Sequence, residues 1–371
     1  MHCPECGKEN PDNAQFCSSC NGALTGASLS AKNPDVRMSR LAIAAFLCAI
    51  LSILFPPFGL VAIILGIVSF IMIDASGGKR TGTLFATLAI LVPVFTFFVI
   101  FVHSVLLRPR AVAFRMTCGT NLSGIGRAML IYANDYEDEL PRAGSRNSQW
   151  GNAVNWQALD RYQAYGLDNR GGGGNVTISS SLYLLIKYSE VTPKSFVCID
   201  DKGTSEFKLS KYRNAAVTEE IDAWDFGPNP AKHYSYSYHM LYGPYALTTS
   251  SDPGMAVAAD RTPWIDSPAA KAKDFSLFKP AVPPWNGTVK RARYGNAITH
   301  QEDGQSVLFM DVHVEFAKRA YCAIDDDNVY THLPDGSEDP QMGKPPVPFI
   351  SQPGHKKDSF LVHDPPAGAG K

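Results

Sequence analysis

The chain has 371 residues, a formal net charge of −1 and 45% hydrophobic residues. A chain of this length can bury more than one core, so several regions are expected. The nearly balanced charge gives no footprint of a nucleic-acid-binding protein. Composition separates a cysteine-rich start, a strongly apolar middle and mixed globular sequence from residue 112 onward.

The first region, residues 1–24, has the cysteine spacing of a zinc ribbon. Cys3 and Cys6 form one Cys-x2-Cys pair, and Cys17 and Cys20 form a second. Two such pairs can hold one zinc ion tetrahedrally and leave no open position for catalysis. Few apolar residues accompany them, so the metal is expected to supply the folding free energy. The alternative, two disulfides in an exported segment, is less expected because MHCPECGKEN is unlike a signal peptide.

A linker at residues 25–40 leads to three apolar segments, which span residues 41–55, 58–73 and 84–107 and contain no Asp, Glu, Lys or Arg. The third has 24 residues, or about 36 Å of helix, and is predicted to cross a bilayer core of about 30 Å. The first two are shorter and are separated by Pro56 and Pro57. They are expected either as two short spans or as one re-entrant hairpin.

Basic residues predict the orientation. Arg37 and Arg40 precede the first apolar segment, and Lys79 and Arg80 lie between the second and third. The positive-inside rule places both positions in the cytoplasm. The zinc ribbon is therefore expected in the cytoplasm and the residues after the third segment outside the bilayer, in the periplasm of a Gram-negative bacterium. The lipid bilayer is the first expected partner.

The block FGLVAIILGIVSFIMIDASGGKRTGTLFATLAILV resembles a small bacterial membrane domain of unknown function with a Gly-Gly-Lys-Arg-x-Gly type of loop. A zinc ribbon often precedes that domain. The resemblance covers about 70 residues and implies an integral membrane protein without naming an activity. Gly59 and Gly66 in this block indicate either close helix packing or ordinary glycines of a membrane helix.

The last region begins with a predicted amphipathic helix. Its apolar residues recur at steps of four and three and are Cys118, Leu122, Ile125, Met129, Tyr132 and Tyr136. A short helix is predicted at residues 181–188, and strands are predicted at 196–199, 234–241 and 255–260. NAITH and SVLFMDVHVEF flank Asp303 and Gly304 and predict a hairpin.

Alternation assigns the two faces of the second strand of this hairpin. The side chains expected to be buried are those of Leu308, Met310, Val312, Val314 and Phe316. Asp311, His313 and Glu315 are then expected on the opposite face, which in a one-sided sheet meets solvent.

Two blocks, CGTNLSGIGRAMLIYANDYEDELP and GNAITHQEDGQSVLFMDVHVEF, resemble the bacterial pseudopilin-like proteins of the type II secretion class. The resemblance covers roughly residues 110–320. It implies an α+β domain, assigned to residues 110–333, in which a helix packs on an antiparallel sheet. No prepilin cleavage signal precedes the helix, so filament assembly is not expected, and Val312 stands where the family usually has Gly. Residues 334–371 are rich in Pro and Gly and are predicted to be disordered.

Polar residues of this domain form two candidate sites. Asp260, His300, Asp311 and His313 are the candidate ligands of a second metal ion, although hydrogen bonds that pin the hairpin are the favoured interpretation. Cys118 and Cys198 are candidates for a disulfide if the domain lies outside the cell. No nucleophile elbow or phosphate-binding loop is found, so no catalytic residue is assigned.

Together these features predict a multi-domain membrane protein with a zinc ribbon, a transmembrane hairpin plus one further helix, and a pseudopilin-like α+β domain. The favoured function is non-enzymatic. The chain is expected to display this domain outside the inner membrane and to have a structural role in an envelope or secretion assembly. One alternative is a sensor or adaptor whose ribbon binds a cytoplasmic partner. The other is a metal-dependent envelope enzyme.

Overall fold

The computed structural model describes the chain except residues 23, 25–36, 213–215, 279–292, 334–342 and 368–371, and except the side chains of residues 106–110. The chain divides into two compact units, Met1–Leu106 and Leu107–Lys371. Most of the predicted linker at 25–40 lies outside the described residues.

After the ribbon, the first unit contains three helical segments joined at one end by a short parallel bridge. They are α1 (Arg40–Leu51), α2 (Pro57–Asp74) and the beginning of α3 (Thr83–Asp135), and the bridge pairs β1 (Arg37–Met38) with β2 (Arg80–Thr81). The helices occupy the three predicted apolar segments. The first helix is shorter than predicted and ends at Leu51, because the chain turns there before Pro57, which begins α2.

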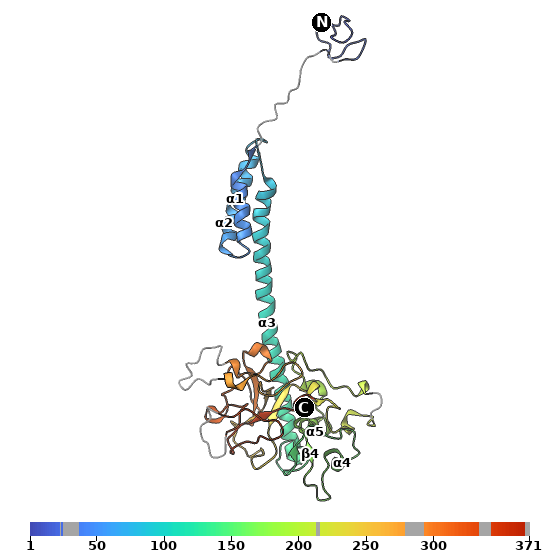
Figure 1. The fold of residues 1–371 in the computed structure, drawn as a ribbon, viewed down its shortest axis with the longest axis vertical. Helices are drawn as coiled ribbons and strands as arrows, with labels where there is room; N and C mark the ends of the chain where they lie inside the picture. Colours follow the sequence, from blue (N-terminus) through green and yellow to red (C-terminus); the bar gives the residue numbers. More distant parts are fainter. Residues whose placement is uncertain (23, 25–36, 213–215, 279–292, 334–342, 368–371) are drawn as a thin grey trace. The chain divides into compact units, whose positions relative to one another are not determined.

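The three helical segments lie side by side (Figure 1), and small residues line the contact between them. The buried residues of α2 recur at steps of three and four and are Gly59, Ala62, Gly66, Ser69 and Ile73. A Cβ atom at Gly66 would lie 3.0 Å from the Ile90 side chain and 3.1 Å from the Ala86 carbonyl oxygen. Gly59 and Gly66 therefore allow close helix packing, as one of the two interpretations predicted.

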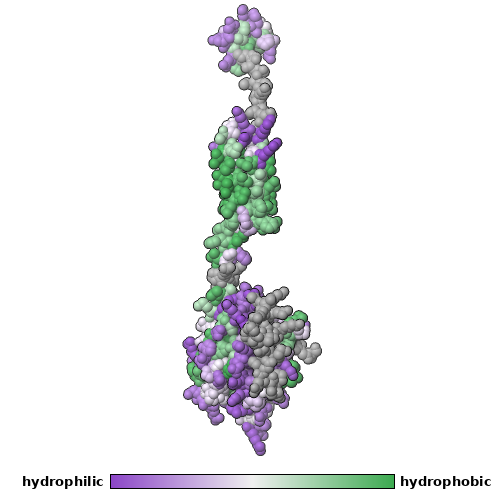
Figure 2. All heavy atoms as spheres, turned by 90° about the vertical axis from the view of Figure 1, so that its left-hand side faces the viewer, coloured by the Kyte–Doolittle hydropathy of each residue, from purple (hydrophilic) through white to green (hydrophobic). Residues whose placement is uncertain are grey.

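Two of the described helical segments, Pro57–Asp74 and Thr83–Val105, are long and apolar enough to cross a membrane. Their larger apolar side chains face outward: Ile64 is 61% exposed and Phe95 is 68% exposed. Figure 2 shows hydrophobic residues across the visible surface of these helices. Small side chains thus meet inside the helix cluster, while large apolar side chains cover its outside.

The second unit is built around the amphipathic part of α3, as its spacing predicts. Cys118, Leu122, Ile125 and Met129 are at most 2% exposed and belong to the main hydrophobic core. Tyr136 lies just beyond the helix and is 38% exposed.

A five-stranded antiparallel sheet packs against α3, in the order β8-β7-β6-β5-β9. Its strands are β5 (Tyr236–His239), β6 (Ala256–Asp260), β7 (Gln305–Phe309), β8 (Val314–Ala317) and β9 (Leu361–Val362). A Cβ atom at Gly126 of α3 would lie 2.7 Å from Leu308 of β7, so the helix approaches the sheet closely there. A helix packed on an antiparallel sheet agrees with the predicted α+β architecture.

The predicted hairpin is misplaced. VLFMDVHVEF forms two strands, because the chain reverses between Phe309 and Val314, where the Phe309 N–H donates to the His313 carbonyl oxygen at 3.0 Å. Val312 has φ +70°, a conformation that favours glycine. NAITH is not a strand, and all of β7 is buried because a second cluster containing Trp264 covers the face opposite α3. The expectation of one continuous strand is therefore wrong, whereas Asp311, His313 and Glu315 are exposed as expected.

The remaining α-helices and strands of the second unit are short. They are β3 (Gln149–Trp150), α4 (Arg161–Tyr165), β4 (Asn175–Val176) and α5 (Ile178–Ser189). The helix predicted at 181–188 is confirmed by α5, and β5 and β6 confirm the strands predicted at 234–241 and 255–260. The strand predicted at 196–199 is wrong: a 3-10 helix, Pro193–Phe196, leads there into irregular chain.

The predicted disordered tail is also wrong wherever the structure describes it. Residues 334–342 and 368–371 lie outside the described residues, but β9 pairs with β5 at the edge of the sheet, and Phe360, Leu361 and Val362 are 0% exposed. This short apolar run pairs with β5 at the edge of the sheet. The pairing is a long-range contact, so the Pro-rich composition of the surrounding residues gave no indication of it.

The tail also supplies a carboxylate at the N-terminus of α5, whose N-cap residue is Thr177. Asp364 accepts hydrogen bonds from the backbone N–H groups of Ile178 and Ser179, at 2.9 and 2.8 Å. These are among the N–H groups that a helix leaves without internal partners, and a negative charge is favourable at that end. The indole N–H of Trp150 donates to the same carboxylate at 2.8 Å.

Asp225 is a second buried carboxylate in this region. Burial, followed by the negative charge of Asp364, raises the pKa of Asp225 to about 7 from an ordinary 3.8, although hydroxyl donors partly oppose this. A carboxyl group with a raised folded-state pKa binds its proton more tightly in the folded chain. Its contribution to stability is therefore complete below pH 4 and is lost as the pH rises to about 7.

We predict that Asp225→Asn changes the pH dependence of stability. As the pH rises from 5 to 8, the unsubstituted chain should lose a few kcal/mol of stability, at about 1.4 kcal/mol per pKa unit, because Asp225 must release its proton. The variant has no such proton, so its free energy of unfolding minus that of the unsubstituted chain should rise by the same amount. Urea titrations of the full chain in detergent, followed by tryptophan fluorescence, measure this. Asp222→Asn, at an exposed carboxylate, is the control and should show a difference that is constant with pH. A constant difference for Asp225→Asn as well would contradict the prediction.

Candidate functional site

The four cysteines of the first region converge on one point. The sulfur atoms of Cys3 and Cys20 lie 3.5 Å apart, as do those of Cys6 and Cys17, and all four lie within 4.8 Å of one another. Zinc–sulfur bonds of about 2.3 Å place tetrahedral sulfurs about 3.8 Å apart. The donor set therefore fits zinc, which would be held by these four thiolates.

The two cysteine pairs sit in turns of the same form. The N–H of Gly7 donates to the Cys3 carbonyl oxygen at 2.8 Å, and the N–H of Asn21 donates to the Cys17 carbonyl oxygen at 2.9 Å. Gly7 and Asn21 both have positive φ, 70° and 60°. Glycine and asparagine adopt that conformation most readily, which explains their places after each pair.

The ribbon has almost no apolar core of its own. Among its described residues, the buried apolar group consists of Cys3, Cys17 and Leu24, with Ala14 packed against them. Asn10 joins the two turns: its side-chain amide donates to the Lys8 carbonyl oxygen at 2.9 Å and to the Cys17 sulfur at 3.4 Å. Such a module depends on its metal for folding.

A second cluster of potential ligands is buried in the second unit. It consists of Cys118, Cys198, Asp260 and His300, whose ligand atoms all lie within 4.8 Å of one another. The first three are 0% exposed and His300 is 3% exposed. The sequence named Asp260 and His300 as candidate metal ligands, with a hydrogen bond that pins the hairpin as the favoured interpretation, and it named the two cysteines as candidates for a disulfide. The structure places all four together: His300 Nε2 lies 3.3 Å from Asp260 Oδ2, and the two cysteines are free thiols.

Asp311 and His313 do not join this cluster. Both lie in the turn between β7 and β8. The His313 ring stacks on the Phe309 ring with centroids 4.4 Å apart, and it pairs with the Asp311 carboxylate. Their side chains are 48% and 51% exposed. Asp260 pairs with the start of β7 instead, accepting the Ser306 N–H at 2.7 Å. The set of four ligands suggested by the sequence is therefore divided between the two ends of β7.

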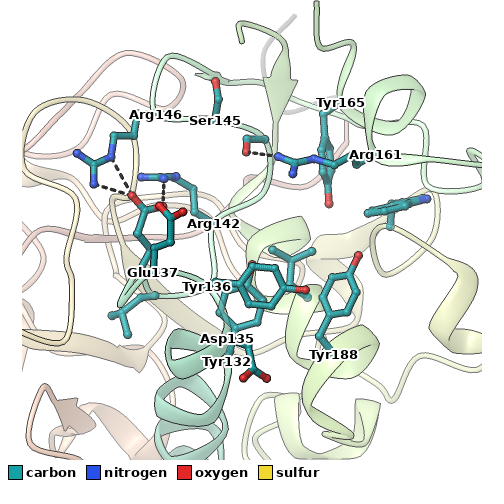
Figure 3. A pocket seen from close by; sticks show the side chains of 15 residues that line it. Tyr132, Asp135, Tyr136, Glu137, Arg142, Ser145, Arg146, Arg161, Tyr165 and Tyr188 are labelled. Atoms are coloured by element: carbon teal, nitrogen blue, oxygen red, sulfur yellow. Dashed lines mark hydrogen bonds and ion pairs between the residues drawn. The ribbon is translucent and has the colours of Figure 1, made fainter. Parts of the chain in front are cut away.

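The second unit also contains an aromatic cleft of about 480 Å³ (Figure 3). The rings of Tyr132 and Tyr136 stack with centroids 4.1 Å apart, and the Tyr188 ring lies 5.6 Å from that of Tyr136. Arg142 and Arg146 both pair with the Glu139 carboxylate. The cleft offers aromatic faces and hydroxyl groups, while these two guanidinium groups already have an anionic partner. Sequence patterns gave no signal for it because its residues come from separate loops and helices.

Comparison with known proteins identifies one domain. The zinc-ribbon domain family matches residues 2–24. No curated protein and no solved structure matches the chain. The chain therefore carries an N-terminal zinc-ribbon domain with Cys3, Cys6, Cys17 and Cys20 in a metal-binding arrangement. The resemblances to the small membrane domain and to the pseudopilin-like proteins stay predictions.

We predict that Cys17→Ser with Cys20→Ser removes one zinc ion per chain and unfolds the ribbon, because two thiolates cannot complete its tetrahedral site. Elemental analysis of the full chain, purified without chelator, measures the metal. Limited proteolysis should then cleave within residues 1–24. Cys48→Ser in α1 is the matched control and should change neither result. Unchanged zinc content in the double variant would contradict the assignment.

Proposed function

We propose that the chain is an integral protein of a bacterial inner membrane that displays its C-terminal α+β unit outside the bilayer and has a non-enzymatic, structural role in an envelope assembly. The observation that carries this proposal is the outward-facing apolar surface of α2 and of residues 83–105 of α3. The cytoplasmic zinc ribbon belongs to the same proposal.

The lengths and surfaces of the helices support membrane insertion. The apolar part of α3 has 23 residues, or about 35 Å, which exceeds the bilayer core of about 30 Å. In water, exposed apolar area costs about 25 cal/mol per Å², and monomeric soluble proteins rarely expose more than a few hundred Å² in one patch. Lipid removes this cost. The α1–α2 turn contains the exposed Leu54 and Phe55 and no charged side chain, so it fits within apolar surroundings as well.

The basic residues at the opposite end of the helices support the orientation. β1 and β2 pair Arg37 with Arg80, and Arg40 and Lys79 are close to them along the chain. The bridge thus collects the four basic side chains at one end of the helix cluster, where they would meet anionic headgroups. A cytoplasmic location for this end places the ribbon on the same side and the second unit on the other.

The aromatic cleft of the second unit favours a binding role over a catalytic one. Its described lining residues include no histidine or cysteine. They include three acidic residues, Asp135, Glu137 and Glu139, of which Glu139 is paired with two arginines. Stacked tyrosine rings present a flat apolar face with hydroxyl groups at its edge, a surface suited to recognition. The pseudopilin-like sequence blocks favour a partner in an envelope or secretion assembly.

We predict that the chain resists alkaline carbonate extraction from bacterial membranes, with its two ends on opposite sides. Protease added to spheroplasts should remove an epitope at the C-terminus, whereas an N-terminal epitope should be cleaved only after lysis. Replacing the four basic residues of the bridge region with glutamine should weaken this orientation, because the positive-inside signal is lost.

Replacing Lys318 and Arg319, which follow β8 in the second unit, with glutamine is the control for that variant and should leave the orientation unchanged. Complete extraction by carbonate would contradict the membrane proposal. Protection of the C-terminal epitope in spheroplasts would contradict the orientation alone.

A further inference from the structure

We propose that the buried cluster of the second unit is a structural metal site for a thiophilic divalent cation of the zinc class. Its ligands are Cys118, Cys198, Asp260 and His300. This site differs from the ribbon and from the set of Asp and His ligands suggested by the sequence. It does not depend on the membrane assignment.

The geometry brings one ligand from each of four places in the fold. Cys118 comes from α3, Cys198 from the loop after Pro193–Phe196, Asp260 from the end of β6, and His300 from a 3-10 turn at His300–Glu302. The His300 Nε2 atom lies 3.3 Å from Asp260 Oδ2 and 3.6 Å from the Cys198 sulfur. All four groups therefore point at one small buried volume.

A hydrogen-bonded pair of His300 and Asp260 does not account for the whole cluster. Ser306 donates its N–H to Asp260 Oδ2, and Oδ1 is buried with no hydrogen-bond partner among the described residues. A buried carboxylate with an unpartnered oxygen is costly, and a cation bound by this carboxylate would offset that cost. The pair also leaves two thiols, which are weak hydrogen-bonding groups, beside the imidazole.

The surroundings of His300 match those of a metal-bound histidine. Its second ring nitrogen, Nδ1, lies 3.8 Å from Asp200 Oδ2, and that carboxylate also accepts the His300 backbone N–H at 2.6 Å. The 3.8 Å separation is longer than a hydrogen bond, but a carboxylate beside the second nitrogen is a common neighbour of metal-ligating histidines. His300, Gln301 and Glu302 all have positive φ, between 56° and 59°, so the ring is carried by an unusual backbone turn.

The donor set selects the kind of metal. Thiolate and imidazole ligands favour zinc over calcium or magnesium, which prefer oxygen ligands. Four protein ligands in a buried position leave no open coordination site, so the role is structural: the ion would tie α3 to β6 and to two loops. The two sulfurs are 2.6 Å apart and would have to separate to about 3.8 Å around zinc.

The test uses the full chain carrying Cys17→Ser and Cys20→Ser, so that the ribbon contributes no metal. This chain, purified with reductant and without chelator, should still contain one zinc ion, and the unsubstituted chain two. Adding Asp260→Asn, which keeps an acceptor for the Ser306 N–H, should lower zinc affinity at least tenfold, and adding His300→Gln should do the same. Cys322→Ser is the matched control at a cysteine outside the cluster and should retain the zinc.

A second measurement covers the case in which a ligand variant fails to fold. Cobalt added to the folded ribbon-deficient chain should give a thiolate-to-cobalt charge-transfer band. Added zinc should remove this band, because zinc displaces cobalt from the site. Absence of both zinc and the cobalt band from this chain, with its tryptophan fluorescence unchanged, would overturn the proposal. So would a disulfide between Cys118 and Cys198, found by mass spectrometry after alkylation of the chain in its native membrane, because disulfide sulfurs cannot serve as thiolate ligands.

Discussion

The structure depends on one constraint: α3 carries two different surfaces along a single helix. From Thr83 to Val105 its side chains are apolar all round, and from Cys118 to Met129 they form one apolar face. A helix that is apolar all round must be surrounded by apolar material, whereas a helix with one apolar face needs a partner on one side. The small residues of α2 meet the first surface, and the antiparallel sheet meets the second.

Burial of the second surface draws polar groups into the interior with it. Asp225, Asp260 and Asp364 are at most 3% exposed, and each accepts at least one hydrogen bond from a backbone N–H group. Carboxylates in such places are retained only where donors or cations satisfy them. Both carboxylate oxygens of Asp364 accept backbone hydrogen bonds at the start of α5, whereas Oδ1 of Asp260 has no hydrogen-bond partner among the described residues. Asp260 also lies beside two thiols and an imidazole, and this set of neighbours makes it a candidate metal ligand.

The ribbon and the buried cluster show how differently two thiolate-containing sites can be encoded. In the ribbon, each turn brings two cysteines together over four residues, so the spacing is visible in the sequence. In the cluster, Cys118 and Cys198 are 80 residues apart, and His300 is 102 residues beyond Cys198. Sequence patterns indicated each of these residues, but they grouped His300 and Asp260 with Asp311 and His313, because His300, Asp311 and His313 match motif positions of the pseudopilin-like family that the two sequence blocks resemble.

The sequence by itself determined what local spacing controls: the ribbon cysteines, the three apolar segments, the amphipathic part of α3, and the strands β5 and β6. Only the tertiary structure decided which strand edges meet and which polar groups are buried together. It divided VLFMDVHVEF into two strands at Val312, and it packed Leu361 and Val362 onto the sheet edge. The physical reason is that helix periodicity and turn chemistry act over a few residues, whereas strand pairing and burial depend on partners far away in the chain.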